Sequence, residues 1–75
     1  MKLALNSELW GYLYYNLREE YYRLKGDMPE SRIDIQNFLK YYSIEIKTDI
    51  DGRWEEVEIV LSDEELTLFL LKWAT

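Results

Sequence analysis

The fold of this chain is decided by one stretch, residues 44–59, which reads IEIKTDIDGRWEEVEI. Apolar and charged side chains alternate on both sides of Asp51-Gly52, a period of two that is typical of strands with one buried face. Asp-Gly between two such runs is the strongest short signal for a hairpin, because a type I′ turn needs positive φ at both central residues. The stretch therefore predicts an antiparallel β-hairpin with its turn at Asp51-Gly52.

A two-residue loop also fixes the register of this hairpin. Apolar side chains then meet on one face, and charged side chains meet on the other. A slip of one residue would destroy this sorting, so the turn chemistry and the hydrophobic pattern agree. The expected opposed pairs are Ile50 with Arg53, Ile46 with Val57, Ile44 with Ile59, Lys47 with Glu56 and Glu45 with Glu58.

A long helix is predicted before the hairpin, over residues 7–25. Ser7 is a suitable N-cap, and Gly26 stands where a C-cap glycine belongs. At about 100° per residue, one arc of this helix is apolar and is expected to be its buried face. The residues of that arc are Leu9, Trp10, Leu13, Tyr14, Leu17, Tyr21 and Leu24.

A second, shorter helix has two competing starts. Ser31 gives one capping signal, and Asp34 gives a better one because Ile33 can staple to Phe38 across the first turn. We therefore expect this helix to run from Asp34 to about Tyr42. The residues expected on its buried face are Ile35, Phe38, Leu39 and Tyr42.

A third helix is predicted after the hairpin. Ser62 and Glu65 form a capping box, and the helix should end near Trp73. Leu68 and Leu71 lie opposite its main apolar stripe, so this helix should be covered on more than one side. Either the other two helices cover it or a second copy of the chain does, so a monomer and a homodimer both fit.

These elements together predict an α+β fold of small size, in a single domain that spans residues 1–75. The element order is α-α-β-β-α, with three helices packed around the antiparallel hairpin. A chain of 75 residues buries a limited core and is marginally stable alone, which makes a partner or a second subunit plausible from the start.

Two residue types, histidine and cysteine, are absent from the sequence. Without them the chain has no thiolate nucleophile, no Ser-His-Asp arrangement and no site in which histidine or cysteine ligates a metal. An EF-hand-like spacing begins at Lys47, but its first ligand should be acidic. No glycine-rich phosphate loop or nucleophile elbow is present. We expect no enzymatic activity, no cofactor and no metal.

The N-terminal residues MKLAL form too short an apolar run for a signal peptide. No stretch of the chain approaches the roughly 18 uninterrupted apolar residues of a membrane span. We therefore expect a cytoplasmic protein that does not bind a membrane.

The negative charge is concentrated in the second part of the chain. Residues 1–42 hold six acidic and six basic side chains, whereas residues 43–75 hold nine acidic and three basic ones. All the excess charge of −6 therefore belongs to the second segment. Direct binding to nucleic acid is disfavoured because phosphate contacts need basic side chains. A basic protein surface is a better match.

The outer face of the hairpin is the first candidate for binding that partner. Like charges such as Glu45 and Glu58 destabilise a strand pair when they are directly opposed, so folding does not require them. Alternate residues on a strand lie about 6.6 Å apart, near the spacing of phosphates along a nucleic-acid strand. The plainer interpretation is a solvated face kept acidic for solubility. The candidate residues are Glu45, Asp49, Trp54, Glu56 and Glu58.

The second candidate surface is made by three tyrosines of the long helix, Tyr12, Tyr15 and Tyr22, which lie outside its apolar arc. Tyrosine offers a large contact area with a polar tip, which suits protein interfaces. The alternative is that the hairpin or the third helix covers these side chains as a second core face.

The charge and the absences favour a small acidic inhibitor that binds a basic, nucleic-acid-binding protein. In size and charge the chain is similar to small acidic phage anti-defence proteins, including some anti-CRISPRs and nucleic-acid mimics, and to some bacterial immunity proteins. This likeness is one of composition, and no family motif carries it. The alternative is a homo-oligomeric structural or assembly accessory protein that uses its tyrosine-rich and apolar helix surfaces.

Overall fold

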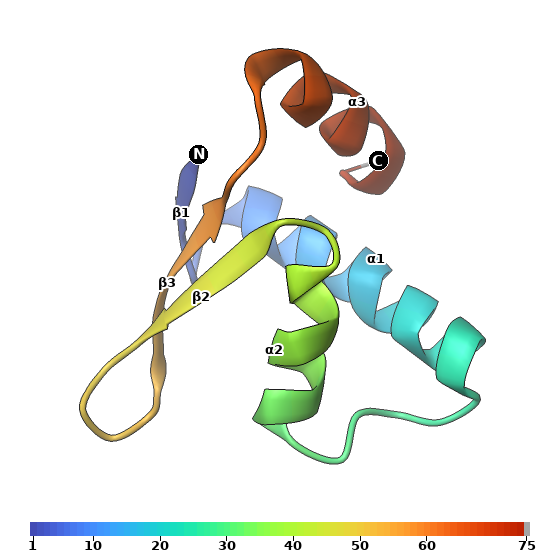
Figure 1. The fold of residues 1–75 in the computed structure, drawn as a ribbon, viewed down its shortest axis with the longest axis vertical. Helices are drawn as coiled ribbons and strands as arrows, with labels where there is room; N and C mark the ends of the chain where they lie inside the picture. Colours follow the sequence, from blue (N-terminus) through green and yellow to red (C-terminus); the bar gives the residue numbers. More distant parts are fainter. Residues whose placement is uncertain (75) are drawn as a thin grey trace.

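The computed structural model describes residues 1–74 and shows three helices and a three-stranded antiparallel sheet (Figure 1). The strand order β1-β3-β2 places β3 in the middle of the sheet. This is the α+β class that the sequence predicts, with one further strand. The elements are β1 (Lys2–Ala4), α1 (Glu8–Lys25), α2 (Arg32–Lys40), β2 (Ile44–Thr48), β3 (Trp54–Ile59) and α3 (Asp63–Trp73).

The unexpected strand, β1, pairs antiparallel with β3 along the edge that the hairpin leaves open. Its three residues are too few to show an alternating pattern in the sequence. Leu3 lies opposite Val57 and extends the inner face of the sheet. The chain then turns sharply into α1, because the Ser7 N–H donates to the Ala4 carbonyl at 3.1 Å. The middle strand is therefore paired on both sides.

The prediction of a two-residue type I′ turn at Asp51-Gly52 is wrong. The Gly52 N–H donates to the Asp49 carbonyl at 3.0 Å, and the Asp49 N–H donates to the Arg53 carbonyl at 2.8 Å. Gly52 has a φ of 80°, whereas Asp51 has no positive φ. The loop is thus one residue longer, a tight turn followed by a left-handed glycine. Ile50 stands at its tip, fully exposed, and does not pair with Arg53.

A β-bulge restores the predicted register beyond this loop. Thr48 lies opposite Trp54. The next pair is Lys47 with Glu56, so Glu55 is an extra residue on β3. The extra residue on β3 offsets the extra residue in the loop. The four confirmed pairs are Ile44 with Ile59, Glu45 with Glu58, Ile46 with Val57 and Lys47 with Glu56.

The first helix follows its prediction, and the second begins earlier than predicted. Ser7 caps α1, and Gly26 closes it in the left-handed conformation with a φ of 74°. The predicted N-cap of α2 at Asp34 is wrong, because the Ser31 side chain accepts from the Asp34 N–H at 3.3 Å. Asp34 lies inside the first turn, where its carboxylate favours the helix N-terminus. Ile33 is exposed and forms no staple.

The third helix begins with the predicted capping box between Ser62 and Glu65. The expectation that it is covered on more than one side is wrong for the single chain. Leu68 and Leu71 are 65% and 66% exposed. α3 packs against α1 through one stripe, and the Asn16 amide donates to the Trp73 carbonyl at 2.6 Å. The residues of that stripe are Leu66, Phe69, Leu70 and Trp73.

The core lies between the inner face of the sheet and the helices. An edge-to-face series of rings runs from Tyr21 through Phe38 and Tyr42 to Trp73, which joins all three helices. Burial raises the pKa of the Tyr42 phenol in this series. The buried residues are Trp10, Leu13, Leu17, Ile35, Phe38, Leu39, Ile44, Val57 and Ile59.

Two leucines of α1 give a matched test of this core. Leu17 is fully buried, whereas Leu24 is 54% exposed although the apolar arc included both. We expect Leu17→Ala to lower the free energy of unfolding by about 2–5 kcal/mol through lost burial and a cavity. Leu24→Ala should cost roughly 0.5 kcal/mol or less. Urea denaturation followed by circular dichroism measures both, and equal costs would contradict this core.

Candidate protein-binding surface

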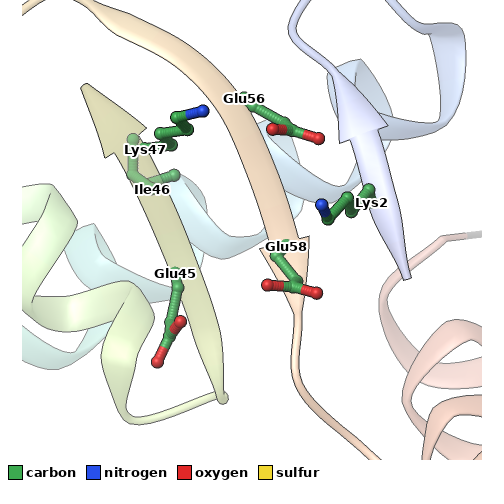
Figure 2. Close-up of a pocket in the computed structure, with 6 residues that line it drawn as sticks. All are labelled: Lys2, Glu45, Ile46, Lys47, Glu56 and Glu58. Atoms are coloured by element: carbon green, nitrogen blue, oxygen red, sulfur yellow. The ribbon is translucent and has the colours of Figure 1, made fainter. Parts of the chain in front are cut away.

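The outer face of the sheet presents charged side chains from all three strands (Figure 2). Glu58 on β3 stands between Glu45 on β2 and Lys2 on β1. Glu56 stands between Lys47 on β2 and a small alanine on β1. The opposed carboxylates of Glu45 and Glu58 are therefore confirmed as neighbours. Lys2 supplies a positive charge beside Glu58 that the predicted hairpin lacked.

These side chains border a shallow depression of about 220 Å³. Glu45 is exposed, and Glu56 and Glu58 are half-buried. Within residues 1–74, none of the three carboxylates forms an ion pair with Lys2 or Lys47. The ion pair found in that range joins Arg23 to Glu20, where the guanidinium lowers the pKa of the Glu20 carboxyl. The carboxylates of the outer face thus remain available to a partner.

Asp49 does not belong to this face, because its side chain builds the loop. Its Oδ1 accepts from the backbone N–H of Asp51 and from that of Arg53, each at 2.9 Å. An aspartate at the first position of a turn commonly makes such bonds. The sequence signal for this role was the aspartate just before Ile50 and the Asp-Gly pair.

Trp54 lies on the opposite side of the sheet from Glu56 and Glu58. The bulge at Glu55 reverses the alternation of side chains, so the indole turns toward the helices. There its ring meets Tyr14 edge to face, with centroids 5.9 Å apart. Regular alternation along the strand predicted Trp54 on the same face as Glu56 and Glu58. The structure instead separates Trp54 from these acidic residues.

The three candidate tyrosines of α1 form a separate, exposed surface. Tyr12, Tyr15 and Tyr22 are 53%, 63% and 51% exposed, so the alternative of a second core face is wrong for the single chain. The Tyr12 hydroxyl donates to a Glu8 carboxylate oxygen at 3.2 Å. The helix carrying them meets the sheet through its other side, where Leu13 and Leu17 are buried.

A groove on the helix side of the hairpin is a feature that the sequence does not predict. Its volume is about 430 Å³, and aromatic side chains and two arginines line it. No local pattern could reveal it, because its residues come from separate parts of the chain. They are Leu5, Trp10, Tyr14, Arg32, Arg53 and Trp54, and they define the aromatic groove.

Comparisons with protein-family models, with curated proteins and with solved structures found no match to this chain. In the part of the chain that the structure describes, no helix is long and apolar enough to cross a membrane. Among residues 1–74, acidic side chains form no group that could hold a metal ion.

Two substitutions test whether Asp49 stabilises the loop as a hydrogen-bond acceptor. Asp49→Ala should lower the free energy of unfolding by about 1 kcal/mol, because two backbone N–H groups lose their acceptor. Asp49→Asn should cost less than about 0.5 kcal/mol, since the amide oxygen can accept the same bonds. Chemical denaturation gives both values. Equal losses for the two variants would show that the charge, and not the acceptor, is what the loop needs.

Proposed function

We propose that this chain is a small acidic inhibitor that binds a basic, nucleic-acid-binding protein through the outer face of its sheet. The observation that supports this most is the set of three unpaired carboxylates on that face, Glu45, Glu56 and Glu58. Folding gains nothing from placing two of them directly opposite each other. A partner that supplies arginine or lysine would relieve this repulsion on binding.

Lys2 and Lys47 lie among the carboxylates of the outer face, so this face carries both positive and negative charges. This mixture narrows the kind of partner that the proposal allows. A uniform row of carboxylates would attract any cation, whereas interspersed lysines repel a partner whose charges fall in the wrong places. The excess negative charge of the surrounding chain would speed the encounter with a basic protein. In this proposal the protein acts in the cytoplasm, in the manner of acidic phage anti-defence proteins, anti-CRISPRs or nucleic-acid mimics.

Neutralising the three carboxylates tests the proposal. The probe is the set of basic proteins that the immobilised chain captures from a lysate. Glu45→Gln, Glu56→Gln and Glu58→Gln together should weaken capture about tenfold or more, because each removes a charge-assisted contact. The wild-type capture should also fall steeply between low and high salt.

The matched control removes the same charge elsewhere. Glu8, Glu19 and Glu64 are exposed and lie outside the outer face, so their combined change to glutamine should leave most of the capture intact. If both triple variants lose capture equally, net charge alone explains the binding. If neither does and salt has no effect, the outer face is not the binding surface.

A second candidate function, homo-oligomeric assembly, is favoured by the exposed apolar side of α3. Leu68 and Leu71 stand three residues apart on one helix, and both are about two-thirds exposed. Contiguous exposed apolar side chains mark protein interaction sites in soluble proteins. The exposed tyrosines of α1 offer a further surface of the kind that interfaces use.

Sedimentation equilibrium at concentrations up to the high micromolar range tests this second candidate. The wild-type chain should show a dimer or a larger species, and Leu68→Ser with Leu71→Ser should return it to a monomer. Leu24→Ser, at another exposed leucine, serves as the control and should not change the mass. A wild-type monomer at every concentration would remove the basis of this function.

A further inference from the structure

The aromatic groove combines an apolar floor with cationic sides. Trp10 is almost fully buried at 4% exposure, and Tyr14 and Trp54 present half-buried rings. Arg32, the first residue of α2, and Arg53, next to β3, are both exposed. The groove thus joins a surface that favours an apolar side chain to two planar guanidinium groups.

A second depression of about 420 Å³ adjoins the aromatic groove and shares Tyr14 and Arg32 with it. Arg18 of α1 lines this neighbouring part, so three arginines follow one path across the surface. Among the described residues that line the two depressions, one is acidic, Glu30. Within residues 1–74, none of these arginines takes part in an ion pair.

In the described part of the structure, these three arginines are unpaired cations on a chain with a net charge of −6. The sequence holds nine basic residues, and three of them line this one path. Arginine pairs with carboxylates through two parallel hydrogen bonds, which lysine cannot do. The two volumes each fall in the range of about 300–1,000 Å³ that is common for ligand sites.

We propose that the aromatic groove and its adjoining depression bind an acidic peptide segment of a partner protein. One aromatic or leucine side chain of that segment would fill the space beside Tyr14 and Trp54. Aspartate or glutamate residues on either side of this anchor would pair with the guanidinium groups of Arg32, Arg53 and Arg18. The inference goes beyond the proposed function, since it concerns another surface and the opposite charge.

A short peptide fits these observations better than a nucleic acid. A few carboxylates meet the three arginines locally, whereas a long polyphosphate would also meet the negative charge of the rest of the chain. The buried and half-buried aromatic floor also supplies the kind of pocket in which peptide anchors dock. A nucleotide or a second copy of this chain is therefore an outcome of the test that counts against the proposal.

A library of random 12-residue peptides displayed on a carrier, selected on the intact protein, tests this site. We expect enriched peptides that carry two or more aspartates or glutamates around one aromatic residue or leucine. Each enriched peptide is then synthesised and titrated into the labelled protein. The indole N–H signal of Trp54 should shift on binding, while that of Trp73, which packs against Tyr42 instead, should not.

Matched variants link the binding to the arginines. Arg32→Gln with Arg53→Gln should weaken the enriched peptides about tenfold or more. Lys25→Gln with Lys40→Gln removes the same charge from exposed positions outside the groove and should leave affinity within about twofold. The substituted side chains are exposed and make no ion pair in the described residues, so the variants should fold, which circular dichroism checks.

Four results would overturn the proposal. They are a selection that yields no enriched peptide, enriched peptides that are basic, equal loss of affinity in both double variants, and shifts confined to Trp73. Tighter binding of a single-stranded oligonucleotide or of a mononucleotide than of the peptides would also overturn it, as would a Trp54 shift that appears without peptide when the protein concentration is raised. The glutamine variants of the outer sheet face should bind these peptides with unchanged affinity. Failure of this peptide-binding proposal can therefore be distinguished from failure of the proposed function.

Discussion

The pairing of β3 on both of its edges is the interaction on which the rest of this structure depends. Val57 and Ile59 point inward from this strand and are fully buried, while Glu56 and Glu58 project to the outer face. A two-stranded hairpin alone would be marginal in water, and the third strand gives the sheet enough area to support a core. The same backbone hydrogen bonds that hold the core therefore also set the positions of the outer carboxylates.

The β-bulge at Glu55 divides the candidate binding side chains of β3 between two faces. Before the bulge, Trp54 turns toward Tyr14 and the helices, and after it, Glu56 turns outward. Without the extra residue, the indole would share a face with the carboxylates. The bulge thus places an aromatic groove with arginines on one side of the hairpin and an acidic face on the other. In Figure 1 the β2–β3 loop projects beyond the helices.

The small size of the chain explains why it leaves so much apolar surface uncovered. α3 contributes one stripe to the core and has no fully buried residue, so Leu68 and Leu71 stay in solvent. A chain of 75 residues has too little structure to cover a helix that is apolar nearly all round. Partners that cover such surfaces would add to the stability of the folded state, because they bind it and not the unfolded chain.

Local chemistry alone determined the class of fold, the caps of α1 and α3, and the register of the central pairs of β2 and β3. These features depend on side-chain periodicity and on residues within about four positions of each other, so the sequence displays them directly. Only the tertiary structure decided the start of α2, the third strand, the bulge that moves Trp54, and the placement of Arg18, Arg32 and Arg53 along two adjoining depressions. The local signals for each of these features are weak, and the packing of distant segments decides between them. No single stretch of sequence therefore predicts them.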